Sequence, residues 1–242
     1  MESSTEIEAP GPNSDCVLVI MAKAPRPGRV KTRLIPSLPL QAVTSFYRCL
    51  LGDTLALAQS LAGVEIAIMC PETDVDELAL VAGPGARVVA QKGEGLAAGL
   101  TSVFAHFAEG YQRRIIAFNS DSPHLPRLVL QGAFEALEAQ DLVVGPTYDG
   151  GYYLVGANRS HPSLFIGDGM GTGSALENLL SQAGVLELSV GFTDPFYDVD
   201  VADDLIQLAA ELEDSPARAP RTASWLKEWG DAITRLRTGT TD

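Results

Sequence analysis

The chain has 242 residues, 46% of them hydrophobic, and carries a formal net charge of -14. This length and hydrophobic content suit one α/β domain with a sizeable core. The acidic balance argues against nucleic acid as a partner, because proteins grip phosphate backbones with broad basic surfaces. No stretch approaches the roughly eighteen uninterrupted apolar residues that a membrane span requires, so we expect no membrane span.

The cysteines and the amino-terminal residues indicate the cellular compartment and the boundaries of the domain. Cys16, Cys49 and Cys70 lie far apart and lack metal-type pairing, which indicates neither a disulfide framework nor a zinc site. Residues 1–14 are acidic and contain neither the basic nor the apolar region of a secretory signal. We therefore expect a cytoplasmic protein with a disordered tail over residues 1–14 and a single domain over residues 15–236.

Short apolar runs alternate with longer amphipathic stretches, which is typical of βαβ units. Strands are expected at residues 17–21, 65–70, 87–90, 114–118, 142–145 and 152–156. Apolar residues recur at helical spacing over residues 39–62, 73–81, 95–109, 126–139, 172–182 and 201–212. A last helix is expected around residues 225–233. This order predicts a three-layer α/β/α fold with a mostly parallel central sheet.

A basic segment directly follows the first predicted strand. Residues 23–33 contain five cations and no acid, namely Lys23, Arg26, Arg29, Lys31 and Arg33. In an acidic protein such a local positive potential selects small, highly charged anions. Ligands of open α/β sheets also bind beyond the carboxyl ends of strands. We therefore expect a phosphate site formed by Lys23, Arg26, Gly28, Lys31 and Arg33, with a solvated basic loop as the alternative.

Polar residues follow the strand predicted at residues 114–118. Asp121 would lie at the carboxyl end of this central strand, facing the expected phosphate site. Mg²⁺ and Mn²⁺ prefer oxygen ligands and share their coordination shell with substrate phosphates. Asp121 is therefore a candidate metal ligand, and the alternative is a turn cap before Pro123.

A second acidic segment lies at residues 197–205. If residues 198–200 are extended, the carboxylates of Asp198 and Asp200 point the same way. Asp203 and Asp204 would belong to the first turn of the next helix, where acids favourably meet the helix dipole. Asp200, and after it Asp198, are therefore candidate partners of Asp121 at the metal. A helix-capping cluster without metal is the alternative.

Two further residues lie near these segments. Asp149 precedes Gly150 between two predicted strands, where an ordinary hairpin turn explains the pair without a substrate role. His124 follows Asp121 by three residues and could line the same cleft, although a surface or capping histidine explains it too.

Four motifs occur in order along the chain. They read Lys23-x-Pro25-x-Pro27-Gly28-x-Val30-Lys31-Thr32-Arg33-Leu34, Ser120-Asp121-Ser122-Pro123-x-Leu125, Asp149-Gly150-Gly151-Tyr152-Tyr153 and Asp198-Val199-Asp200. Over roughly residues 17–212 the chain resembles the rSAM/selenodomain-associated transferase family, which includes proteins named arsenosugar biosynthesis glycosyltransferases. The resemblance implies a GT-A-like nucleotide-diphospho-sugar transferase fold, with the nucleotide over the first loop and a divalent metal at Asp121. The family's Trp-Ser-Thr element is replaced here by residues 170–174.

The motifs and the resemblance together predict a metal-dependent glycosyltransferase that moves a sugar from a nucleotide-activated donor to a small-molecule acceptor. The loop cations would neutralise the diphosphate, and Mg²⁺ or Mn²⁺ on Asp121 and Asp200 would stabilise the leaving phosphate. Asp149 would orient the acceptor or act as its base. The alternative is a guanylyltransferase-like nucleotidyltransferase, which would bind a nucleoside triphosphate and release pyrophosphate. A nucleotide-binding module without catalysis is a third possibility.

Overall fold

A computed structural model describes residues 14–108, 113–166 and 173–238 of the chain. It contains one sheet with the strand order β3-β2-β1-β4-β6-β5-β7. The strands are β1 (Cys16–Met21), β2 (Val64–Cys70), β3 (Arg87–Ala90), β4 (Arg114–Asn119), β5 (Leu142–Pro146), β6 (Tyr152–Ala157) and β7 (Val190–Phe192). Neighbouring strands pair in parallel except at β6, which runs antiparallel to both β4 and β5.

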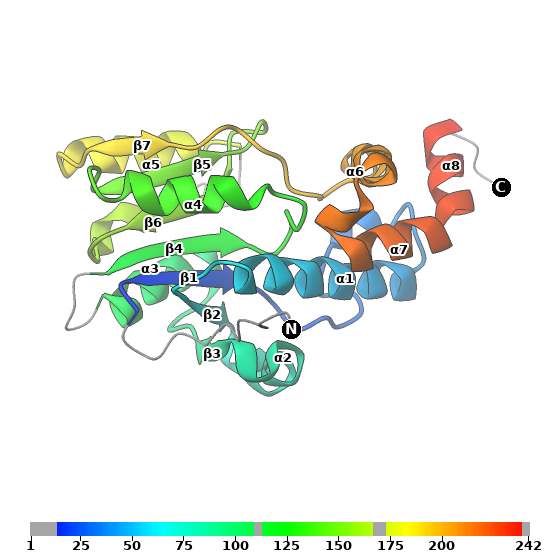
Figure 1. Ribbon diagram of the computed structural model, residues 1–242, viewed down its shortest axis with the longest axis horizontal. Coiled ribbons are helices and arrows are strands. Elements are labelled where there is room, and N and C mark those ends of the chain that lie inside the picture. Colours follow the sequence, from blue (N-terminus) through cyan, green and yellow to red (C-terminus); the bar gives the residue numbers. More distant parts are fainter. Residues whose placement is uncertain (1–13, 109–112, 167–172, 239–242) are drawn as a thin grey trace, which may run out of the picture.

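Helices cover both faces of the sheet (Figure 1). They are α1 (Leu40–Gln59), α2 (Val75–Ala82), α3 (Gly95–Phe107), α4 (Arg127–Ala136), α5 (Ala175–Val185), α6 (Ala202–Asp214), α7 (Pro220–Glu228) and α8 (Gly230–Thr238). Helices α1, α2 and α4 pack on one face, and α3 and α5 pack on the other. The structure therefore confirms the predicted three-layer α/β/α fold with its mostly parallel sheet. Among the described residues, no helix combines the length and apolar character needed to cross a membrane.

Strand β1 shows why these residues form a central strand. Successive side chains of a strand point to opposite faces of the sheet. Leu18 and Ile20 belong to the core cluster beneath α1, whereas Val17 and Val19 belong to the cluster beneath α3. All four side chains are fully buried. An uninterrupted apolar run is therefore what a strand with helices on both faces requires.

The strand order reverses at β1 and β4, and we call the space beyond the carboxyl ends of these two strands the crevice. From β1 the chain continues through α1 to β2 and β3, and it then returns through α3 to β4 on the other side of β1. Helices α1 and α3, which make these two connections, lie on opposite faces of the sheet, so the chain changes its direction of travel across the sheet between β1 and β4. Such a switch point is where open α/β sheets bind ligands. The segment after Met21 and the segment after Asn119 therefore face each other, since these residues are paired in register.

Three features of the fold differ from, or lie beyond, the predicted elements. Strand β7 was not expected, because it is a three-residue edge strand without full burial. The expected last helix is wrong as a single element: α7 ends at Glu228 and α8 begins at Gly230. Trp229 lies at this break and stacks on Trp225, with ring centroids 5.5 Å apart. The predicted disordered tail lies outside the described residues, except for Ser14.

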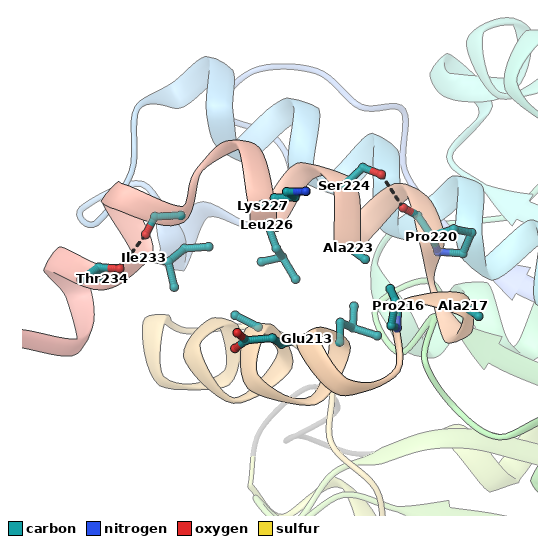
Figure 2. A pocket seen from close by; sticks show the side chains of 13 residues that line it. Glu213, Pro216, Ala217, Pro220, Ala223, Ser224, Leu226, Lys227, Ile233 and Thr234 are labelled. Atoms are coloured by element: carbon teal, nitrogen blue, oxygen red, sulfur yellow. Dashed lines mark hydrogen bonds between the residues drawn. The ribbon is translucent and has the colours of Figure 1, made fainter.

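Helices α6, α7 and α8 lie beyond the carboxyl ends of β1 and β4 (Figure 1). A cavity of about 810 Å³ opens between α6 and the α7–α8 pair, and Figure 2 shows the side chains that line it. Its lining is mostly apolar, with Glu213, Ser224, Lys227 and Thr234 as polar members. None of the predicted site residues lines this cavity.

A buried carboxylate on α1 attaches α7 to the rest of the structure. The Asp53 side chain is 1% exposed and accepts hydrogen bonds from the backbone N–H of Arg221 at 3.2 Å and of Thr222 at 2.7 Å. These are two of the first N–H groups of α7, which have no partner within the helix. Asp53 therefore caps α7 from another helix, 168 residues away along the chain.

We expect Asp53→Asn to lower the free energy of unfolding by about 2 kcal/mol, because hydrogen bonds to a buried charged group are worth roughly 1.5 to 3 kcal/mol. The amide also presents a donor where the helix requires an acceptor. Urea unfolding followed by circular dichroism measures the change. Asp76→Asn, on the exposed face of α2, is the matched control and should stay within about 0.5 kcal/mol of wild type. Equal losses in the two variants would contradict the capping role.

Candidate functional site

The basic segment after β1 forms a tight turn followed by an inward-pointing lysine. The backbone N–H of Arg29 donates to the carbonyl of Arg26 at 3.1 Å, and Gly28 between them has φ +74°. A Pro-Gly pair at these central positions is typical of a type II turn. Lys31 then adopts a left-handed conformation with φ 46°, which is uncommon for a residue other than glycine. Its side chain is only 4% exposed.

Three carboxylates converge beside this lysine. One oxygen each from Asp121, Asp198 and Asp200 lies within 4.8 Å of the others. Asp121 follows β4, whereas the other two precede α6, so the cluster joins segments far apart in the sequence. The backbone N–H of Val199 donates to the carbonyl of Asp121 at 3.3 Å, and the Val199 side chain is fully buried. The structure thus brings together the three acids that the sequence nominated.

The Lys31 ammonium lies between two members of this carboxylate cluster. Its Nζ is 2.9 Å from Asp121 Oδ2 and 2.7 Å from Asp200 Oδ1. Burial works to lower the pKa of Lys31, but the charges of Asp121 and Asp200 outweigh it and raise the pKa overall. Arg33 is 66% exposed and adds a longer contact, 3.4 Å from Asp200 Oδ2. The negative charge of the carboxylate cluster is therefore partly neutralised by the Lys31 ammonium.

The three acids differ in their electrostatic surroundings. Burial, and after it the charge of Asp200, raise the pKa of Asp198 to about 6. Burial also acts to raise the pKa of Asp200, but Lys31 reverses this effect and the pKa is lowered. Asp198 is therefore the member whose negative charge is least compensated by the side chains around it.

Asp204 has the capping role expected of it. Its Oδ2 accepts hydrogen bonds from the backbone N–H groups of Asp200 and Val201, both at 2.8 Å. Asp203 is exposed in the first turn of α6. Asp203 and Asp204 thus belong to the first turn of α6, whereas Asp198 and Asp200 belong to the carboxylate cluster. The Asp204 side chain holds the backbone of Asp200 in place.

The remaining cations of the loop take different directions. Arg26 turns away from the carboxylate cluster and pairs with Asp74 at 3.0 Å and Glu77 at 2.7 Å, which attaches the loop to α2. Among the described residues, Lys23 and Arg29 are exposed and make no ion pair. The structure therefore places Lys31 and Arg33 at the carboxylates, holds Arg26 on a neighbouring helix and leaves Lys23 open to solvent.

A partly buried hydrogen-bond chain connects the loop to Asp121. The backbone N–H of Lys23 donates to the Tyr47 hydroxyl at 3.1 Å, and that hydroxyl lies 3.2 Å from Ser120 Oγ. Ser120 Oγ in turn donates to Asp121 Oδ1 at 3.2 Å. Burial, and after it the charge of Asp121, raise the pKa of Tyr47 to about 12, so its hydroxyl keeps its proton. Tyr47 carries no sequence signal of this role, because it follows the apolar spacing of α1.

Asp149 lies in the turn between β5 and β6. Its Oδ1 accepts hydrogen bonds from Thr147 Oγ1 at 2.6 Å and from the backbone N–H of Gly151 at 3.2 Å. Gly150 has φ +87°, and a β-carbon there would clash with the carbonyl of Gly173. The turn lies at the same edge of the sheet as Asp121, because β5 and β4 both run antiparallel to β6. Asp149 is exposed and is not a member of the carboxylate cluster.

His124 does not line the crevice, and the expectations of a cleft or surface position are wrong. Its side chain is fully buried, with ring centroids of Phe196 and Tyr197 each 4.8 Å away. Neither ring nitrogen has a hydrogen-bond partner among the described residues, and Nε2 lies 3.8 Å from Glu211. Burial, with the nearby charge of Arg218, lowers the pKa of His124 to about 3. His124 is therefore a neutral core residue.

Comparison with known proteins identifies a family model and solved structures that are similar to this chain. Residues 54–172 match the family model described as "Uncharacterized protein conserved in bacteria (DUF2064)". No curated protein matches the chain. A solved structure from Desulfovibrio desulfuricans G20, described as a "putative nucleotide-diphospho-sugar transferase", is 28% identical with a TM-score of 0.83. That match covers 92% of this chain and 98% of the other.

More distant structures share the fold at lower identity. The 4-diphosphocytidyl-2C-methyl-D-erythritol synthase of Anaerococcus prevotii DSM 20548 is 11% identical with a TM-score of 0.54, over 82% of this chain and 96% of the other. A CMP:2-keto-3-deoxy-manno-octonic acid synthetase, solved in complex with CTP, is 12% identical with a TM-score of 0.52. That match covers 82% of this chain and 98% of the other. The Desulfovibrio match confirms the expected nucleotide-diphospho-sugar transferase-like fold, and the more distant structures share that fold.

His124 should make the folded protein sensitive to acid. The pKa of His124 is about 3 in the folded protein and about 6.5 in the unfolded chain. Between these two pH values the histidine is protonated in the unfolded chain and neutral in the folded protein. Stability is then lost as the pH falls below about 6.5, and the loss between pH 7 and pH 4.5 should be about 2 to 3 kcal/mol. We expect His124→Phe, which keeps the aromatic contacts, to remove this part of the pH dependence. Urea unfolding at both pH values measures it, and an unchanged slope would contradict the assignment.

Proposed function

We propose that this protein is a metal-dependent glycosyltransferase that uses a nucleotide-activated sugar and a small-molecule acceptor. The observation that carries the proposal is the convergence of Asp121, Asp198 and Asp200 on Lys31 in the crevice between β1 and β4. At a topological switch point, carboxylates that can bind a metal and a lysine that can bind phosphate suit a metal-bound diphosphate. The four sequence motifs, and the fold shared with a described nucleotide-diphospho-sugar transferase, support the same reading.

The carboxylate cluster fits Mg²⁺ or Mn²⁺. It offers three hard oxygen donors close enough together to contact one ion, and such cations take carboxylates together with substrate phosphates and water. Burial, and after it the negative charge of Asp200, raise the pKa of Asp198, and a divalent ion would compensate that neighbouring charge. When bound, the metal would stabilise negative charge that develops on the leaving phosphate.

The cations of the loop would bind the diphosphate. Lys31 and Arg33 already face the carboxylates, and Lys23 is exposed at the carboxyl end of β1. Gly28 has no side chain and lies in an exposed turn, which lets a phosphate approach its backbone. Arg26 would act on the nucleotide through the loop it holds in place, because its guanidinium is paired with α2.

In the proposed reaction the bond between the anomeric carbon of the sugar and the β-phosphate oxygen breaks. The acceptor oxygen bonds the anomeric carbon, the acceptor proton passes to a base, and a nucleoside diphosphate leaves. We assign Asp149 as the group that orients the acceptor or takes this proton, because its carboxylate is exposed at the same edge of the sheet and is fixed by two hydrogen bonds.

Nucleotidyl transfer is the second candidate, favoured by the fold shared with a synthetase solved in complex with CTP. The same crevice would then bind a nucleoside triphosphate, and an acceptor oxygen would attack the α-phosphate with release of pyrophosphate. Lys31 and the carboxylate cluster would serve either reaction, so the leaving group separates the two.

Product analysis distinguishes these reactions. The protein is incubated with Mn²⁺ and panels of nucleotide sugars and nucleoside triphosphates, and nucleoside diphosphate and pyrophosphate are measured separately. We expect metal-dependent release of nucleoside diphosphate from a nucleotide sugar. Release of pyrophosphate instead would establish the second candidate. Nucleotide-dependent thermal stabilisation without either product would contradict both and leave a binding module.

Asp121→Asn should reduce kcat by about 10² to 10³, by analogy with the loss of one electrostatic stabiliser of a developing charge. The measurement is the rate of product release at saturating donor and metal. Asp203→Asn makes the same change at an exposed acid that begins α6 and should leave the rate within about twofold of wild type, as for most surface substitutions. An unchanged rate in Asp121→Asn would remove Asp121 from the metal site.

A further inference from the structure

We propose that Lys31 is a displaceable counter-ion of the carboxylate cluster, and that its ammonium leaves Asp121 and Asp200 for a nucleotide phosphate when metal binds. This inference rests on the proposed function, because it concerns the same metal and nucleotide. It adds a coupling between the two ligands: metal and nucleotide each bind more tightly when the other is present.

The position of the ammonium carries the first step. Lys31 Nζ contacts one oxygen of Asp121 and one of Asp200 at salt-bridge distance, and both acids are candidate metal ligands. An ammonium has three donors and no acceptor, so each contact uses lone pairs that a metal would need. A divalent ion that binds beside Lys31 would also meet a like charge within contact range. Metal and ammonium therefore compete for the same carboxylates.

The exposed fractions of the three side chains show from which side a ligand would reach them. The Lys31 side chain is 4% exposed, whereas the Asp121 and Asp200 side chains are 23% and 38% exposed. The carboxylates therefore open toward the crevice, from which a phosphate would arrive. Lysine also has a long flexible side chain with a point charge at its end. The ammonium can thus change partners while the backbone of Lys31 stays in its left-handed conformation.

A reciprocal coupling follows from this competition. A metal that binds alone must displace the ammonium from both carboxylates and leave it without an anionic partner. A nucleotide phosphate provides that partner, and it also supplies oxygens to the metal. Each ligand should therefore raise the affinity of the other by the same factor, as linkage requires. Arg33 contributes less to the competition, because it is exposed and reaches Asp200 only at 3.4 Å.

Mn²⁺ binding in the absence of any nucleotide tests the inference. Free Mn²⁺ is measured by electron paramagnetic resonance during titration of wild type, Lys31→Gln and Arg29→Gln. We expect Lys31→Gln to bind Mn²⁺ at least tenfold more tightly than wild type, because the competing cation is gone. Arg29→Gln makes the same charge change on the same loop at an exposed residue without a carboxylate partner among the described residues, and should bind within twofold of wild type. Equal Mn²⁺ affinity in wild type and Lys31→Gln would overturn the inference.

A second variant covers the case in which Lys31→Gln does not fold. Lys31→Arg keeps the charge, and its guanidinium can hold both carboxylates, so it should bind Mn²⁺ no more tightly than wild type. Tighter binding by Lys31→Arg would contradict the counter-ion role. Because these titrations contain no nucleotide, their outcome is separate from the product analysis. If Lys31→Gln binds Mn²⁺ tenfold more tightly but the wild-type protein gives no transferase product, the counter-ion role is upheld and the proposed function is contradicted.

Discussion

The repulsion among three neighbouring carboxylates, and its compensation by one buried ammonium, is the constraint on which the site depends. Asp121, Asp198 and Asp200 come within 4.8 Å of one another, and Lys31 contacts two of them. A buried charge pair is maintained only where its geometry is well defined. The left-handed backbone of Lys31 and the hydrogen bond from Val199 to Asp121 supply that geometry. The same compensation makes the cluster a place where one cation can replace another.

The fold supplies the rest of the site through contacts that are distant in sequence. Strands β1 and β4 lie side by side only because the chain reverses direction across the sheet after β3. Arg26 attaches the loop to α2, and the hydroxyls of Tyr47 and Ser120 link the same loop to Asp121. The first contact attaches the loop to a neighbouring helix, and the second attaches it to a member of the carboxylate cluster. Lys31 can therefore exchange partners on a backbone that is held from two directions.

Sequence patterns predicted the layers and the acids better than they predicted the cations. Strand β1 is recognisable because a strand buried on both faces is an apolar run. Asp121 is recognisable because it follows a central strand, whereas Asp198 and Asp200 lie before α6 and belong to no strand. Nothing in a run of five cations tells which will point inward. The direction of Lys31 depends on its φ angle, and that of Arg26 depends on Asp74, directly before α2, and on Glu77 in α2. The core position of His124 likewise depends on two aromatic residues from a distant segment.

The most direct test is a crystal structure of the protein grown with Mn²⁺ and a nucleoside diphosphate, with anomalous differences collected at the manganese edge. The account predicts one anomalous peak among Asp121, Asp198 and Asp200, with Lys31 Nζ moved onto a phosphate oxygen. A manganese peak away from these carboxylates would contradict the metal site. A peak at the carboxylates with Lys31 still bridging Asp121 and Asp200 would contradict the exchange of cations.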